Sequence, residues 1–250
     1  MVTDDRLRNR VVYSKNAYTE CIYCGEESGT RDHVPSKVFL NKPFPENLPT
    51  LPACIKCNNS YSNDELVVSL LVQLLKQKHY GSEYSFSEEI MSRIENERNV
   101  DIVNNIRDSI SSGQVSKFHN QILNVLAKLA IGHLVWEISE GYYVDEESTS
   151  CSVSLSYSFL NDMHKQEINE FSSYFIITNE TLPELGSRAY DERILVFESD
   201  GVEPQLLLDW VEVQPLEYKY TCYKFVNEIV VKMVINNLLF AEVTLKNAYS

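Results

Sequence analysis

Residues 21–59 read CIYCGEESGTRDHVPSKVFLNKPFPENLPTLPACIKCNN and contain two Cys-x-x-Cys pairs, Cys21/Cys24 and Cys54/Cys57. Four thiolates at this spacing are typical of a tetrahedral zinc site, and a zinc ion with four protein ligands has no open position for a substrate. The segment is rich in Pro, Gly and Asn, and its apolar residues are too sparse to form a core of their own. We therefore expect a small loop-rich module in which a structural zinc ion supplies much of the folding free energy.

The composition of the whole chain is that of a soluble globular protein. Of its 250 residues, 44% are hydrophobic and 23% are charged, and no apolar run approaches the roughly 20 residues that span a bilayer. The N-terminal residues MVTDDRLRNR contain no apolar signal region. We expect a cytoplasmic protein that does not associate with membranes, in which Cys151 and Cys222 are buried reduced thiols.

The net charge of −14 is distributed unevenly along the chain. Residues 1–80 carry ten basic and nine acidic side chains, whereas residues 81–250 carry 12 basic and 27 acidic ones. An excess of acidic groups repels the phosphates of nucleic acids. Only the N-terminal part of the chain is therefore suited to contact with nucleic acid.

Four periodic patterns after the second cysteine pair predict helices. They cover residues 58–79, 88–98, 100–110 and 115–138. In the first of these patterns, Ser62 and Glu65 have the spacing of a capping box. The last carries a largely apolar stripe and is expected to be a core helix; the stripe consists of Phe118, Ile122, Val125, Leu126, Leu129, His133 and Trp136.

From residue 150 onward, apolar residues recur with a period of two, which predicts β-strands. The stretches are SVSLSYSF, YFIITNE, RILVFES, LLLDWVEVQ, YKYTCYKF, EIVVKMVI and LLFAEVTL, and the last two flank Asn236 and Asn237 as in a hairpin. Together the patterns predict an α+β fold. We expect a zinc module in residues 1–80 and an acidic domain in residues 81–250, with helices in 88–138 and antiparallel strands in 150–247.

Three further sequence elements accompany the cysteines. Asp32-His33 and Asn47-Leu48 lie between the two pairs, and Asn58 directly follows the last cysteine. In this order, over roughly residues 18–66, the chain resembles the HNH endonuclease family, whose pattern is a cysteine pair, Asp-His or Glu-His, Asn-Leu, and a second pair followed by Asn or His. The resemblance implies a ββα-metal fold and metal-dependent hydrolysis of phosphodiester bonds in DNA, with RNA as the less favoured substrate.

The resemblance also implies a role for each matching residue. His33 would be the general base that takes a proton from the attacking water. Asp32 and Asn58 would bind one Mg²⁺ or Mn²⁺ ion through oxygen atoms, and Asn47 would orient the hairpin loop and His33. The expected phosphate contacts, by charge and proximity, are Arg31, Lys37 and Lys56.

Two departures from the family pattern leave the asparagine ligand open. The interval between the Asn-Leu pair and the second cysteine pair is slightly long and contains two prolines, and no histidine closely follows Cys57. Asn59 or one of residues 62–64 could therefore take the position given to Asn58.

The four cysteines alone also allow a zinc-stabilised module that binds nucleic acid or protein without catalysis. The stretches LAKLAIGHLVWE and DWVEVQPLEYKY resemble uncharacterised bacterial proteins with an N-terminal HNH module, a likeness that implies no activity. The acidic domain could bind a protein partner, mediate self-assembly or shield the module. Since the overall negative charge disfavours binding to DNA, we expect a gated nuclease. An example is a bacterial defence effector that a partner or assembly activates.

Overall fold

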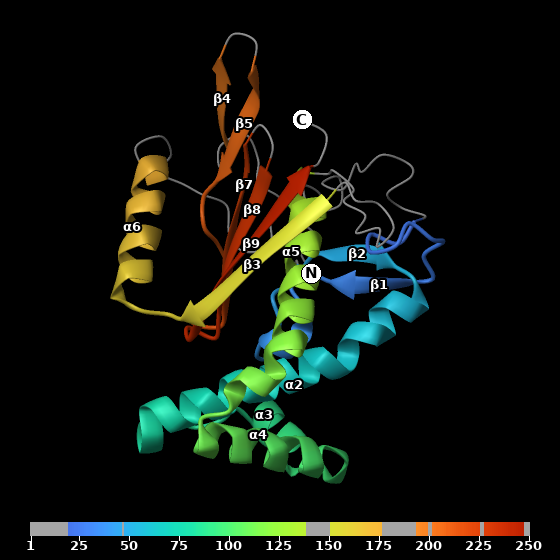
Figure 1. The fold of residues 1–250 in the computed structure, drawn as a ribbon, viewed down its shortest axis with the longest axis vertical. Coiled ribbons are helices and arrows are strands. Elements are labelled where there is room, and N and C mark those ends of the chain that lie inside the picture. The colour runs from blue at the N-terminus through green and yellow to red at the C-terminus, as the bar shows by residue number, and fades with distance from the viewer. Residues whose placement is uncertain are drawn as a thin grey trace.

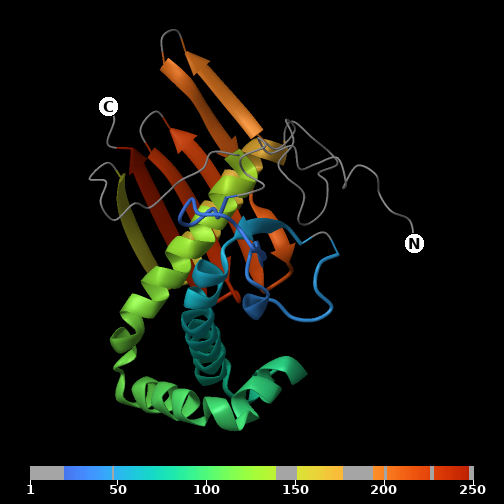
Figure 2. The same cartoon turned by 90° about the vertical axis from the view of Figure 1, so that its right-hand side faces the viewer.

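A small two-stranded module, a group of helices and an antiparallel sheet follow one another along the chain in the computed structural model (Figure 1). The structure describes residues 20–46, 48–138, 151–176, 194–199, 202–225 and 228–247. One long helix, α5 (His119–Ile138), lies between the module and the sheet, as Figures 1 and 2 show from two directions. This arrangement confirms the predicted α+β fold class.

The N-terminal module is a β-hairpin followed by a long helix. Strands β1 (Thr30–His33) and β2 (Thr50–Ala53) pair antiparallel, with Asp32 opposite Leu51. A 3₁₀ turn, η2 (Lys37–Phe39), lies in the connection between them. Helix α2 (Ile55–Tyr80) begins directly after β2 because Cys54 caps its first turn, with the Cys57 amide donating to the Cys54 Sγ at 3.3 Å.

The other predicted helices are also present. They are α3 (Glu88–Glu95), α4 (Val100–Ser112) and α5, and the 3₁₀ turns η3 (Gly81–Glu83), η4 (Glu97–Asn99) and η5 (Val115–Phe118) precede them. The predicted apolar stripe is buried throughout, from Phe118 to Trp136. Within the described ranges, none of the helices combines the length and the apolarity that crossing a bilayer would require.

The predicted capping box at Ser62 and Glu65 is wrong, because α2 begins at Ile55 and both residues lie inside it. The Ser62 hydroxyl donates to the Asn58 carbonyl of the preceding turn at 3.2 Å. Glu65 forms an ion pair with a lysine of α5. The spacing of these two residues therefore placed the start of the helix too late.

The C-terminal half forms one antiparallel sheet. Its strands are β3 (Cys151–Phe159), β4 (Ile194–Ser199), β5 (Val202–Leu208), β6 (Val211–Gln214), β7 (Tyr218–Phe225), β8 (Glu228–Ile235) and β9 (Leu239–Asn247). The strand order is β3-β9-β8-β7-β5-β4, and β6 pairs with β7. The predicted terminal hairpin is confirmed: β8 pairs with β9, and Asn236 and Asn237 turn the chain with φ of 51° and 50°.

A helix that the sequence pattern did not predict packs on the sheet. Helix α6 (Asp162–Ile176) contains residues 174–176 of the stretch YFIITNE, for which the predicted strand is therefore wrong; the rest of that stretch lies outside the described residues. Ile168 of α6 packs with Val234 and Phe240. The neighbouring Ile235 belongs to the core that includes α5. Because successive side chains of a strand point to opposite faces, α6 and α5 lie on opposite faces of the sheet.

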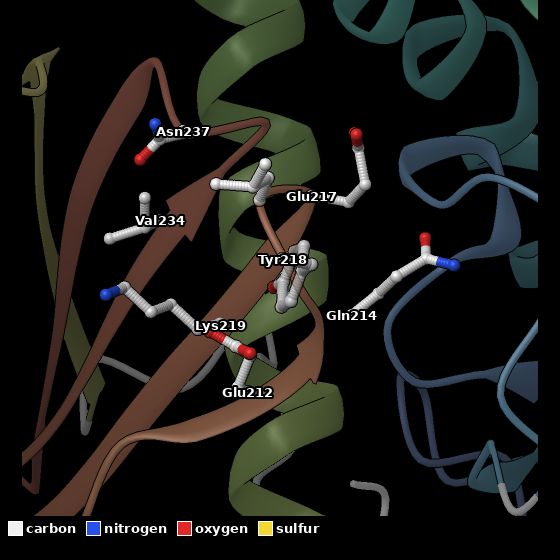
Figure 3. Close-up of a pocket in the computed structure, with 8 residues that line it drawn as sticks. Glu212, Gln214, Glu217, Tyr218, Lys219, Val234 and Asn237 are labelled. Carbon is white, nitrogen blue, oxygen red and sulfur yellow. The ribbon is translucent and has the colours of Figure 1, made fainter. Parts of the chain in front are cut away.

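One hydrophobic cluster joins the helices to the sheet. It contains side chains from α2 to α5 and from β6 to β9, and so includes residues on both sides of the boundary predicted after residue 80. A polar contact also ties the sheet to the module. The Gln214 amide group donates to the carbonyls of Asn41 (2.8 Å) and Pro43 (3.3 Å), and its oxygen accepts from the Asn41 amide at 2.8 Å. Figure 3 shows this side chain directed away from the sheet, toward the N-terminal segment.

His133 makes the stability of this core depend on pH. Its ring is fully buried, stacks on Tyr220 with ring centroids 3.7 Å apart, and lies 2.8 Å from the Tyr218 hydroxyl. Burial lowers the pKa of His133 from 6.5 to about 3. Between these values the unfolded chain binds a proton that the folded chain does not bind. The free energy of unfolding therefore falls as the pH drops, by about 2 kcal/mol at pH 5.

We expect the His133→Gln variant to lack this pH-dependent part of the free energy of unfolding, because glutamine does not titrate. Urea denaturation at pH 7.5 and pH 5.0 measures the difference: wild type should lose about 2 kcal/mol more than the variant between the two conditions. The other titrating groups are the same in both proteins and cancel in the comparison. Equal losses in wild type and variant would contradict a buried neutral imidazole.

Candidate metal centre and the adjacent hairpin

Four cysteines converge where the hairpin meets α2. The sulfur atoms of Cys21, Cys24, Cys54 and Cys57 all lie within 4.8 Å of one another, and those of Cys24 and Cys54 are 3.8 Å apart. A tetrahedral zinc ion with Zn–S bonds of about 2.3 Å holds its sulfur atoms about 3.8 Å apart. The four side chains can therefore bind a metal ion such as zinc. Among the described residues, no other group of His, Cys, Asp or Glu side chains has this arrangement.

The first cysteine pair lies on a tight turn. Gly25 follows Cys24 with a φ of 75°, a conformation that glycine adopts readily because it has no Cβ. The Gly25 amide donates to the Cys21 carbonyl at 2.8 Å, and the Cys21 amide donates to the Glu26 carbonyl at 2.6 Å. These bonds close the turn and bring the two thiols of the pair together.

The second cysteine pair lies at the N-terminus of α2. The Cys57 amide that donates to the Cys54 Sγ lowers the pKa of the Cys54 thiol and so favours the thiolate, the form that binds metals. Outside this cluster, Cys222 is a buried free thiol, as predicted. The side chain of Cys151 lies outside the described part of the chain.

The module packs directly against α5. A buried cluster contains Cys21, Ile22, Tyr23, Val34, Leu51, Ala53 and Cys54 of the module and Ile131, Val135 and Trp136 of α5. Gly132 lies at the closest approach, since a Cβ at this position would lie 3.1 Å from the Val34 Cγ2. A methyl group at Gly132 would therefore require the Val34 side chain to shift by a few tenths of an ångström.

A buried lysine of α5 pairs with the acidic residue of the Asp-His dipeptide. Lys128, whose side chain is 2% exposed, places its Nζ 2.7 Å from the Asp32 Oδ2 and 2.5 Å from the Glu65 Oε1. The same ammonium donates to the Ser36 hydroxyl at 2.6 Å. The Tyr23 hydroxyl donates to the Asp32 Oδ2 at 2.7 Å. We call these five residues the Lys128 cluster.

Sequence reasoning missed the Lys128 cluster. The one available signal was a charged residue within the most apolar part of the predicted core helix, in the stretch VLAKLAIGHLVW. A lysine is almost never fully buried unless it is paired. Its position therefore indicated an acidic partner, although nothing in the sequence indicated which one.

His33 is partly exposed at the end of β1. Burial lowers the pKa of His33 below its ordinary value of 6.5, and the positive charges of Lys37 and Lys128 act in the same direction. The adjacent carboxylate of Asp32 acts in the opposite direction but does not reverse the shift. The neutral imidazole, the form that can accept a proton, is therefore favoured at neutral pH.

Asn58 contacts the strand that carries Asp32. Asn58 lies in the first turn of α2, and its amide nitrogen donates to the Thr30 hydroxyl at 3.1 Å. Thr30 and Asp32 are two positions apart on β1, so their side chains point to the same face of the strand. The described contacts thus place Asn58 beside Thr30, about 7 Å along β1 from the position of Asp32.

The remaining predicted site residues are three basic side chains and Asn47. Arg31, Lys37 and Lys56 are exposed. The Arg31 guanidinium donates to the hydroxyl of Thr50 at 2.8 Å and to its carbonyl at 2.6 Å, which holds the hairpin strands together. Asn47 lies outside the described residues.

Of the alternatives to Asn58, Asn59 is exposed. Asp64 accepts a hydrogen bond from Asn124 of α5 at 2.6 Å.

Comparison of the chain with protein-family models, with curated proteins and with solved structures gives no match.

Proposed function

We propose that the hairpin and the first turn of α2 form an HNH-type nuclease site that hydrolyses phosphodiester bonds in DNA. The observation that carries this proposal is the position of Asp32 and His33 on β1, next to a four-cysteine cluster that joins the hairpin to α2. The order of the sequence elements supports the same function. In this proposal the zinc ion is structural, because four cysteine ligands leave it no open position.

His33 would act as the general base. Its imidazole is partly exposed, and its lowered pKa favours the neutral form, which can accept a proton from an attacking water. Asp32 lies beside it on the strand but points to the other face, where the Lys128 cluster holds it. The base and the acidic residue therefore have different surroundings and different roles.

By their chemistry, the oxygen atoms of Asp32 and Asn58 would suit a second, divalent cation. The described partners of the Asp32 carboxylate contact Oδ2, which leaves Oδ1 for a ligand. The Asn58 amide donates through its nitrogen, which leaves its oxygen. Carboxylate and amide oxygens are ligands that Mg²⁺ and Mn²⁺ accept. When bound, such an ion would neutralise the scissile phosphate and stabilise the departing 3′ oxygen. Asn47 would orient the loop beside His33.

The exposed cations Lys37 and Lys56 would contact DNA phosphates, and Arg31 would do so while it braces the hairpin. The excess of acidic side chains in residues 81–250 opposes indiscriminate binding. Because of this charge distribution, we propose that the enzyme is gated. A protein partner or self-assembly would activate it, as in a bacterial defence effector. Complete degradation of plasmid DNA by the purified protein alone would contradict the gating.

The experiment that tests the nuclease function is a DNA cleavage assay in Mg²⁺ or Mn²⁺ with His33→Ala. We expect the variant to lose activity by a factor of about 10²–10⁴, because the general base is absent, and to keep its zinc. His119→Ala, which removes an exposed imidazole of α5, is the matched control and should cleave like wild type. Wild-type activity in His33→Ala, or an equal loss in the control, would contradict the role of His33.

One observation favours a second function. The Lys128 ammonium already neutralises Asp32 at 2.7 Å, as expected if Asp32 only supports the fold. The module would then bind nucleic acid or protein without catalysis. Retained DNA binding with no cleavage in any divalent cation, with or without candidate partners, would favour this alternative.

A further inference from the structure

A groove lies at the end of α2 opposite the cysteine cluster. Five segments form it: the last turn of α2, the end of α4 with η5, the end of β3, the start of α6, and the turn between β8 and β9 (Figure 1). Its volume is about 600 Å³. This is within the range of pockets that hold small organic ligands.

Part of the groove's lining is aliphatic. These side chains are Leu75, Ile110, Val115, Leu160 and Leu238. Two aromatic rings at the rim, Tyr80 and Phe159, are 40% and 57% exposed. An apolar ligand in the groove would cover both rings. The aliphatic side chains of the lining suit contact with a hydrocarbon chain.

The charged residues of the groove are all basic. Lys78, His79 and Lys165 line it, and no Asp or Glu does, although the chain contains 36 acidic residues. The Lys78 ammonium donates to the Ile110 carbonyl at 2.8 Å, which fixes it beside the apolar wall. Lys165 is 58% exposed and lies 3.3 Å from the Asp162 carboxylate, which is fully exposed. A pair of this kind is weak, so Lys165 can turn to another anion.

We propose that this groove binds an amphipathic anion, specifically the carboxylate of a medium-chain fatty acid. The hydrocarbon chain lies against the leucine, isoleucine and valine side chains, and the carboxylate pairs with Lys78 and Lys165. The site is independent of the nuclease function. Both share α2, which begins directly after Cys54 and ends at the wall of the groove.

Calorimetric titration of the zinc-loaded full chain with octanoate, decanoate and dodecanoate, below their micelle concentrations, tests the proposal. We expect one ligand per chain and an affinity that rises about threefold to fourfold for each added methylene. The double variant Lys78→Gln/Lys165→Gln should bind dodecanoate at least about tenfold more weakly, because it lacks both charge partners.

Lys42→Gln is the matched control. Lys42 is 61% exposed and lies 3.5 Å from Glu89, as Lys165 lies near Asp162, but it does not line the groove. It should leave the affinity unchanged. The proposal is overturned if dodecanoate does not bind, if dodecylamine binds equally well, if the double variant binds like wild type, or if adenosine monophosphate binds more tightly than dodecanoate.

Discussion

Serine in place of Cys54 is expected to release the metal ion and to unfold the hairpin of the N-terminal module. Zinc binding to small zinc-finger peptides has an apparent free energy of about 10–16 kcal/mol at pH 7, which is free energy of folding. Apart from its contacts with α5, the module has few other sources of stability. Its strands are short, β1 spanning Thr30–His33 and β2 Thr50–Ala53. Cys54 also caps α2, but a serine hydroxyl can accept the same amide hydrogen bond, so the variant removes the candidate metal ligand and keeps a helix cap.

Elemental analysis and hydrogen exchange measure this result. Cys54→Ser should contain much less than one zinc per chain, and the amides of β1 and β2 should exchange rapidly. The amides of β7 to β9 should stay protected, because these strands belong to the other hydrophobic cluster. Cys222→Ala, which removes a buried thiol outside the cluster, should keep one zinc per chain. Slow exchange of β1 and β2 in zinc-free Cys54→Ser would show that the metal does not stabilise the module.

Methionine in place of Lys128 is expected to destabilise the protein by about 3–5 kcal/mol. The reason is not the loss of a favourable ion pair but the two carboxylates that remain. Asp32 is 7% exposed, and the Glu65 side chain is 13% exposed. Without the ammonium, neither has a compensating charge. The free energy of unfolding, from urea denaturation at pH 7.5, gives the size of the effect.

A triple variant separates the charge effect from a packing effect. Adding Asp32→Asn and Glu65→Gln to Lys128→Met removes both uncompensated charges and should recover a large part of the lost stability. Lys232→Met is the matched control. Lys232 also pairs with two carboxylates, those of Glu167 and Glu242, but these side chains are 44% and 37% exposed and water can solvate them. Its loss should cost at most about 1 kcal/mol. A triple variant as unstable as Lys128→Met would contradict the charge explanation.

The features predicted correctly from the sequence depend on residues close together in the chain. The spacing of each Cys-x-x-Cys pair limits where its thiols can lie, and the structure brings both pairs within 4.8 Å. The period of two in EIVVKMVI and LLFAEVTL, with Asn236 and Asn237 between them, predicts the terminal hairpin because the turn is local.

The features that the sequence did not predict depend on contacts between distant residues or on an unusual cap. Helix α2 begins early because a cysteine thiol, not a serine hydroxyl, caps it. The end of α6 was predicted as a strand because Phe175 and Ile176 are apolar residues that also suit strands. Lys128 meets Asp32 across 96 positions in the chain, and the pattern of neither segment specifies that contact.

The position of α5 limits how the module could be transferred to another protein. One side of this helix covers Val34 and Leu51, and Lys128 supplies the positive charge for Asp32. A chimaera that took only residues 20–80 would expose that apolar surface and leave Asp32 without its counter-ion. A transplantable unit therefore extends at least through Ile138. Exchange of this module between proteins by recombination would require α5 to move with it, or the new host to provide a helix with a glycine and a lysine at matching positions.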